Sequence, residues 1–194
     1  MSLSMHELAK RFIDVALASI LLAALAVPML LIGLAVAVTS RGPMLYWSDR
    51  IGKENRVFRM PKFRSMYSGT PPVATHLLNN PDAHITPIGR VLRRTSLDEL
   101  PQLWSVLAGD MSLVGPRPAL FNQDDLIRAR TRAGVHRLRP GITGWAQING
   151  RDEVPIPVKV ALDAEYLSRR SIAFDLAILW RTVWKVVKRD GVMH

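Results

Sequence analysis

The chain has 194 residues, which suits one domain, and carries a net charge of +10 from 26 basic and 16 acidic residues. Such a basic excess points to an anionic partner, whether nucleic acid, anionic lipid or a phosphorylated substrate. The chain contains no cysteine, which excludes disulfides, thiolate chemistry and cysteine-ligated zinc. Hydrophobic residues make up 48% of the chain although 22% is charged, so we expect the apolar residues to be concentrated in one place.

The segment 15–38 contains no charged residue and is long enough to cross a bilayer. A cleaved signal peptide is disfavoured, because the apolar run is too long and Pro28 lies in its middle. Two alternatives remain open: a helix that spans the membrane with a tolerated proline, and a helix that enters, bends at Pro28 and returns to the same face. Basic residues flank both ends, which favours keeping both ends cytoplasmic. These residues are Lys10, Arg11, Arg41, Arg50 and Lys53.

The segment 41–66 predicts a short β-hairpin. A turn is expected near Gly52, and apolar and polar residues alternate around residues 57–60. Lys62 and Arg64 lie two residues apart, so on a strand their side chains would share one face.

A helix is predicted to begin at Thr86 and Pro87, with the threonine as its cap and the proline at its first position. Arg90, Arg93 and Arg94 then fall on one face of this helix at spacings of three and four residues. This face is either a solvated basic surface or an anion site next to the carboxylates that follow, and the spacing alone leaves both alternatives open.

Two adjacent carboxylates, Asp98 and Glu99, follow the arginines. Ser96 and Glu99 fit a capping box, in which the serine caps a helix and the glutamate reaches back to its amide. Pro101 would lie too deep in such a helix, and a helix that starts nearer Leu100 tolerates it better. The carboxylates would then lie at the mouth of the helix, as a cap or as a reaction centre.

The rest of the chain offers three further features. Arg117 stands between two prolines, which restrict the backbone, and its planar guanidinium suits bidentate phosphate binding. Residues 139–151 are dense in turn signals and predict a shaped loop. From Asp175 onward a helical stripe of apolar residues faces away from basic residues, which is typical of a helix in a membrane interface and also of a helix packed on a soluble core. The stripe consists of Leu176, Leu179, Trp180, Val183 and Val187.

Four stretches of the chain resemble the bacterial sugar transferases, the monotopic phosphoglycosyl transferases. They read KRFIDVALASILL, KFRSM, RRTSLDELPQLWSVLAGDMSLVGPRP and RPGITGWAQINGR, and the resemblance extends from residue 10 to residue 191. It implies an α+β, helix-dominated fold of the minimal, catalytic-domain-only form. Residues 1–40 would be a re-entrant membrane helix kinked at Pro28. Residues 41–194 would be a cytoplasmic domain with a short β-hairpin and interfacial amphipathic helices, at the cytoplasmic face of the bacterial inner membrane.

The resemblance also implies a reaction. Such enzymes transfer a sugar-1-phosphate from a UDP-sugar to undecaprenyl phosphate, release UMP and require Mg²⁺. Carried over, Asp98 is the nucleophile that forms a phosphosugar-aspartate, and Glu99 is its helper, as a base for the lipid phosphate or as a metal contact. Asp98 and Glu99 are also the expected metal ligands. The expected substrate-binding residues are Lys62, Arg64, Arg90, Arg94 and Arg117.

The chain departs from the family's pattern at two places. Val27 precedes the membrane proline where the family often has serine, so the geometry of the kink is not carried over. Residues 47–50 read Trp-Ser-Asp-Arg where the family often has R-Q-x-R, so no glutamine contact is expected there.

The main rival function is a membrane-tethered nucleic-acid-binding protein that would use the +10 charge. It leaves the two carboxylates unexplained and lacks a recognisable nucleic-acid motif, so we expect no nucleic acid among the partners. A two-metal nucleotidyl transferase would need a wider spread of carboxylates. The sequence leaves open the sugar, the glycan pathway and the oligomeric state, a homodimer included.

Overall fold

The structure is a computed structural model that describes residues 5–71, 73, 80–150 and 154–188, and helices dominate it. The helices are α1 (Met5–Thr39), α2 (Pro87–Thr95), α3 (Gln102–Ala108), α4 (Asp124–Arg132), α5 (Trp145–Asn149), α6 (Ile156–Arg169) and α7 (Ile172–Lys188). The strands are β1 (Leu45–Ile51), β2 (Val57–Phe63), β3 (Ser112–Val114) and β4 (Gly141–Thr143). The predicted helix-dominated α+β class is therefore confirmed.

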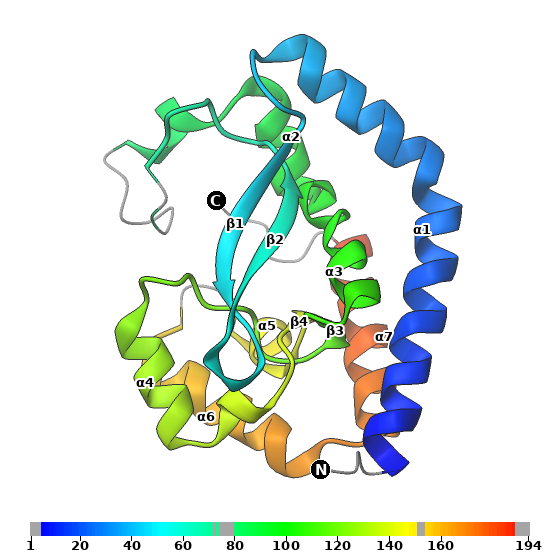
Figure 1. The fold of residues 1–194 in the computed structure, drawn as a ribbon, viewed down its shortest axis with the longest axis vertical. Coiled ribbons are helices and arrows are strands. Elements are labelled where there is room, and N and C mark those ends of the chain that lie inside the picture. The colour runs from blue at the N-terminus through cyan, green and yellow to red at the C-terminus, as the bar shows by residue number, and fades with distance from the viewer. Residues whose placement is uncertain (1–4, 72, 74–79, 151–153, 189–194) are drawn as a thin grey trace.

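Helix α1 runs along one whole side of the molecule (Figure 1). Its two ends lie at opposite ends of the rest of the described chain, from residue 41 onward, which we call the body. Its 35 residues correspond to about 52 Å, more than the thickness of a bilayer's hydrocarbon core. The helix continues through Pro28 and bends in the C-terminal half that contains it (Figure 1). A proline inside a helix removes one backbone hydrogen bond, which accounts for a bend there.

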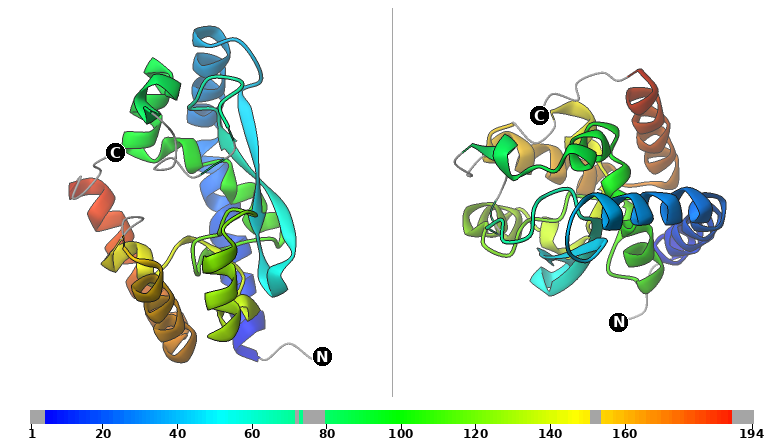
Figure 2. Two further views of the ribbon diagram at one scale, coloured as in Figure 1. Left: turned by 90° about the vertical axis from the view of Figure 1, so that its left-hand side faces the viewer. Right: turned by 90° about the horizontal axis from the view of Figure 1, so that it is seen from above.

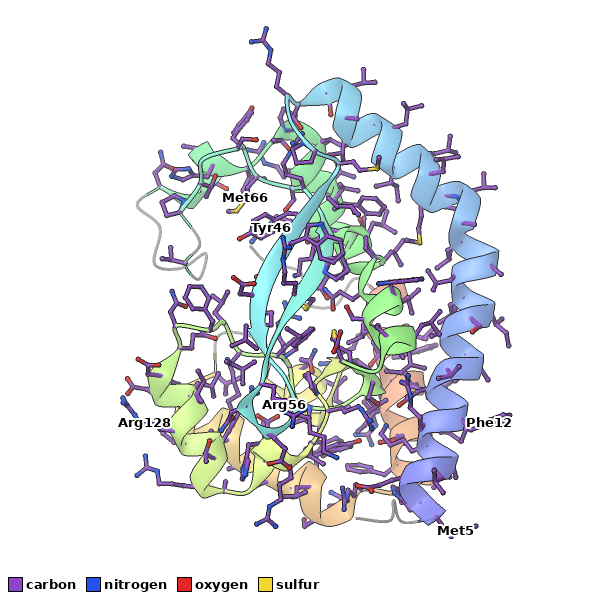
Figure 3. All side chains as sticks on the ribbon, in the orientation of Figure 1. Met5, Phe12, Tyr46, Arg56, Met66 and Arg128 are labelled. Atoms are coloured by element: carbon purple, nitrogen blue, oxygen red, sulfur yellow. The ribbon has the colours of Figure 1, made fainter. Side chains whose placement is uncertain are left out.

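The outer face of α1 is apolar and uncovered. Ile20, Val27, Leu30 and Leu34 are each at least 60% exposed, and Phe12 projects away from the body (Figure 3). Only 11% of the most apolar 18-residue window of this helix is buried. An apolar surface of this extent is typical of a membrane or protein contact, and it excludes a helix buried in the core of a soluble protein.

Near its N-terminal end, α1 is joined to the body by partly or fully buried polar contacts. Lys10 donates to Asp175 of α7, with 2.6 Å between Nζ and Oδ2. Asp14, which is 5% exposed, accepts from the Ser112 hydroxyl at 2.8 Å and from the Leu113 amide at 3.1 Å. A buried carboxylate is stable only when it is hydrogen-bonded, so these contacts fix the register of α1 against β3.

The C-terminal end of α1 is held by Arg64. Its Nη2 donates to the carbonyl and to the hydroxyl oxygen of Ser40, both at 2.7 Å. Positive charge is favourable at a helix C-terminus, where carbonyl groups lack helical partners. The same body therefore holds α1 at both of its ends.

The hydrophobic core forms two clusters, and α1 contributes to both. Ala18 belongs to the larger cluster, which also draws buried residues from β2, β3, α3, α5, α6 and α7. Val36 packs with Phe63 of β2 and Leu92 of α2 in the smaller cluster. Helix α1 contacts α2, α3, β2 and β3, and Figure 2 shows its course from two further directions.

The predicted hairpin is confirmed. Strands β1 and β2 pair antiparallel from Leu45 opposite Phe63 to Ile51 opposite Val57. The turn between them places Glu54 and Asn55 at positive φ, at 55° and 57°.

A second, parallel pair of strands was not predicted. Strand β3 pairs with β4, which lies in the stretch expected to be a loop. The two segments approach so closely that a Cβ atom on Gly141 would lie 2.1 Å from the amide nitrogen of Gly115. Only glycine fits at such an approach, and this explains why the stretch reads as turn-rich although it contains a strand.

We expect Asp14→Ala to lower the free energy of unfolding by about 1–3 kcal/mol, because the Leu113 amide and the Ser112 hydroxyl would lose a buried acceptor. The measurement is unfolding of the detergent-solubilised protein by heat or denaturant. Asp125→Ala is the matched control, since the Asp125 side chain is 81% exposed. Equal stability of the two variants would contradict the assigned role of Asp14.

Candidate active site

Asp98 and Glu99 lie in a single 3-10 turn, Leu97–Glu99, between α2 and α3. Ser96 ends α2 in the left-handed conformation, with φ of 57°, and its side chain caps neither segment. Of the two alternatives, the capping box is therefore wrong, because the left-handed serine interrupts the helix. Helix α3 begins only at Gln102, after Pro101, which agrees with the alternative start nearer Leu100.

The Glu99 carboxylate is neutralised by two cations from distant parts of the chain. Its Oε1 accepts from Lys62 Nζ at 2.8 Å and from Arg117 Nη2 at 3.1 Å. Burial alone would raise the pKa of Glu99, but Arg117 and Lys62 hold it far below its ordinary value. Glu99 is thus an anion throughout the physiological range and a weak base.

Asp98 lies in a different environment, although it is adjacent to Glu99 in the sequence. Its side chain is buried, with 7% of the residue exposed, and burial raises the pKa of Asp98 above its ordinary value. The negative charge of Glu99 acts in the same direction, and Lys62, Arg93 and Arg117 oppose both effects. Two carboxylates whose surroundings push their pKa values apart are characteristic of reaction centres.

Three elements bring the cations to this turn. Lys62 comes from β2, Arg93 from α2 and Arg117 from the loop after β3. The turn lies where α2, α3 and β2 meet (Figure 1). The site is thus assembled from residues separated by up to 55 positions in the sequence, counted from Lys62 to Arg117.

The other predicted substrate-binding residues lie elsewhere. Arg64, which follows β2, is buried against the C-terminal end of α1, where it contacts Ser40. The side chains of Arg90 and Arg94 are exposed, and the described residues show no ion pair from either of them to the two carboxylates. The arginine of α2 that acts on Asp98 is Arg93. Spacing placed all three arginines on one helix face, and only the orientation of α2 against the turn distinguishes them.

The sequence pattern of the bacterial sugar transferase family matches residues 5–189, and the chain belongs to that family. The resemblance stated from the sequence is thereby confirmed.

Three relatives illustrate the similarity. An undecaprenyl-phosphate glucose phosphotransferase of Komagataeibacter xylinus is 42% identical over 91% of this chain and 35% of its own length. An undecaprenyl-phosphate galactose phosphotransferase of Salmonella typhimurium is 37% identical over 94% of this chain and 41% of its own length. A UDP-glucose:undecaprenyl-phosphate glucose-1-phosphate transferase of Caulobacter vibrioides is 38% identical, over 95% and 72%. The chain thus spans well under half the length of the first two.

Replacing Asp98 with Asn should raise the melting temperature at about pH 7.5 and raise it less at about pH 4.5. A carboxyl whose pKa is raised in the folded state contributes stability that is complete below its unfolded pKa of about 3.9 and is lost as pH rises through the folded pKa. A neutral amide has no such loss. The measurement is thermal unfolding in detergent with EDTA at both pH values.

Asp125→Asn is the control for this experiment, because Asp125 is exposed and its replacement should change neither melting temperature. An Asp98→Asn protein that loses more stability at pH 7.5 than at pH 4.5 would show that the folded site favours the charged form of Asp98.

Proposed function

We propose that this chain transfers a sugar-1-phosphate from a UDP-sugar to undecaprenyl phosphate and releases UMP. The observation that carries the proposal is the division between the two carboxylates: Glu99 is neutralised by Lys62 and Arg117, while Asp98 is buried beside the same cations. The names of the family relatives support the substrate classes. Relatives of similar identity are named for glucose and for galactose, so the proposal stops at UDP-sugar.

In the first step, a carboxylate oxygen of Asp98 attacks the phosphorus that bears the sugar. A bond forms between that oxygen and phosphorus, and the bond from phosphorus to the UMP oxygen breaks, so UMP leaves with the electron pair. An ionised carboxylate needs no base to remove a proton. Lys62 and Arg117 supply positive charge to the phosphate oxygens, which is the main protein contribution to phosphoryl transfer.

In the second step, a phosphate oxygen of undecaprenyl phosphate attacks the phosphosugar-aspartate. The new bond joins the two phosphates, the bond to Asp98 breaks and the carboxylate is restored. A phosphate monoester is largely ionised at neutral pH, so this nucleophile also needs no strong base. Glu99, as a weak base held by two cations, is assigned to positioning Lys62 and Arg117.

The proposed metal ion is Mg²⁺, held by Asp98 and Glu99. Among the described residues no group of three or more potential metal-binding side chains occurs, and this site offers the two carboxylates of Asp98 and Glu99. Mg²⁺ is commonly bound by one or two carboxylates together with substrate phosphates and water, and this donor set fits that pattern. When bound, the ion would neutralise negative charge on the pyrophosphate.

The attachment of α1 supports the re-entrant arrangement. Lys10 and Asp14 join its first turns to the body, and Ser40 joins its last turn to Arg64 of the same body. A polar catalytic body lies on one side of a membrane, so a helix bound to it at both ends enters and leaves on that side. We place the body at the cytoplasmic face of the bacterial inner membrane, where the basic flanks of α1 favour it.

Helix α7 supports the same placement. Leu176, Trp180, Val183 and Trp184 are 51–70% exposed, whereas Ile178 on another face is buried in the core. An exposed apolar face with two tryptophans is typical of a helix in a membrane interface. Of the predicted stripe, Leu176, Trp180 and Val183 are exposed, whereas Leu179 packs against the core. The side chain of Val187 lies outside the described residues. A homodimer stays a prediction.

We expect Asp98→Asn to abolish UMP release from a UDP-sugar panel with undecaprenyl phosphate and Mg²⁺, because a neutral amide is a poor nucleophile at phosphorus. Wild-type protein given the correct UDP-sugar without the lipid should gain the mass of one sugar phosphate on the peptide containing Asp98. The measurements are a UMP assay and intact-protein and peptide mass spectrometry. Asp125→Asn, the exposed control, should behave as wild type. An adduct on another residue, or substantial turnover by Asp98→Asn, would overturn the assignment.

The topology is tested with single cysteines, which need no background removal because the chain has none. Met5→Cys precedes the apolar part of α1, and Asp125→Cys lies on the body beyond it. In intact cells, a membrane-impermeant maleimide should label neither variant, and after lysis it should label both. Labelling of Met5→Cys alone in intact cells would establish a spanning helix and exclude the re-entrant arrangement.

A further inference from the structure

The loop that presents Arg117 is fixed through its carbonyl oxygens. The two flanking prolines have no amide hydrogen, so neither can donate a backbone hydrogen bond. Each of the three consecutive carbonyls has a donor from a different element. The Pro116 carbonyl accepts from the Gly141 amide at 2.9 Å, the Arg117 carbonyl from Arg130 Nη1 at 2.7 Å, and the Pro118 carbonyl from Arg50 Nη1 at 3.2 Å.

The donor to the Arg117 carbonyl is itself held by a buried ion pair. Arg130 of α4 donates through Nε and Nη2 to Oδ2 of Asp163 in α6, at 2.9 and 2.7 Å. The two residues are 8% and 1% exposed. The guanidinium is thus divided: two nitrogens bind the carboxylate, and the third points at the backbone of the loop.

This division matters because a guanidinium is planar and rigid. Once Asp163 fixes two of its nitrogens, the direction of the third is determined. Buried ion pairs often contribute little net stability, since desolvation offsets the attraction between the charges. What this pair supplies is geometry, at the loop residue whose side chain reaches Glu99.

We propose that Arg130 and Asp163 form a positioning pair that fixes the backbone at Arg117 and thereby aims the Arg117 guanidinium at the reaction centre. Neither residue contacts the two carboxylates, so both act through Arg117. The assignment rests on the proposed function in one respect, namely that Arg117 binds substrate phosphate.

A double-mutant cycle tests this coupling. Arg130→Lys keeps the charge opposite Asp163, but a single ammonium group cannot reproduce the planar fork. In the wild-type background it should lower kcat/KM by about tenfold to a hundredfold, since small misplacements of a substrate-orienting group have effects of this size. In an Arg117→Met background the same change should cost less than about twofold. An equal loss in both backgrounds would mean that the pair does not act through Arg117.

The matched control is Arg128→Lys. Arg128 lies on the same helix, its side chain is 67% exposed and points away from the body (Figure 3), and it pairs with Asp125 at the surface. Its replacement should leave kcat/KM unchanged. If Arg130→Lys does not fold, Arg130→Met combined with Asp163→Leu takes its place in the cycle, because removing both partners leaves no unpaired buried charge.

A second readout does not depend on activity. Arg130→Lys should increase hydrogen exchange in the peptide covering residues 115–121 of the protein without substrate, and leave exchange in α2 unchanged. If Arg117→Met leaves no turnover to measure, hydrogen exchange alone tests whether Arg130 positions the Arg117 loop. Unchanged exchange at 115–121 would overturn the positioning role. Increased exchange in a protein that releases no UMP from any UDP-sugar would retain that role and reject the proposed function instead.

Discussion

The structure of the site depends on one arrangement of charge: a partly buried glutamate that two cations neutralise together. Lys62 and Arg117 reach Glu99 from a strand and from a proline-bounded loop. Removing either cation would leave a partly buried charge under-compensated, and such charges are costly. The ion pairs therefore hold β2, the turn before α3 and the loop after β3 in fixed relation. They also leave Asp98 beside two cations that are already bound to its neighbour.

The membrane helix and the rest of the chain are built as one packed unit. Residue 40 marks a change in composition and closely follows the end of α1 at Thr39, yet the packing crosses that boundary. Ala18 and Val36 of α1 sit in the two core clusters, and Asp14 and Arg64 hold the two ends. Such an arrangement fixes the height of the reaction centre relative to the apolar face of α1. The proposed acceptor, a lipid-linked phosphate confined to the membrane surface, would require a reaction centre at a fixed height.

Features with local signals could be predicted, and those set by tertiary placement could not. The apolar helix, the hairpin and the Thr86 cap follow from periodicity, turn residues and capping chemistry, and each appears in the structure. Lys62 was expected from a family motif, and Arg117 from its proline-bounded loop as well as a family motif; both contact Glu99. The helical spacing did not single out Arg93, because Arg90 and Arg94 lie on the same helix face. The parallel strands and the Arg130–Asp163 pair carry no local signature, since their partners lie 29 and 33 residues apart.

The net charge of +10 also has a different meaning once the contacts are known. Many of the arginines bind backbone carbonyls of the protein itself. The recipients are Val106 and Leu107 for Arg11, Pro118 for Arg50, Ser40 for Arg64, Arg117 for Arg130, and Gly109 for Arg139. Two of these arginines, Arg11 and Arg139, meet at the C-terminal end of α3, and there burial and the neighbouring cation lower the pKa of Arg11. The basic composition alone therefore overstates how much positive charge is available to an anionic partner. For the proposed phosphorylated substrate, the positive charge beside Asp98 comes from Lys62, Arg93 and Arg117. The internal arginines Arg50 and Arg130 help to place Arg117.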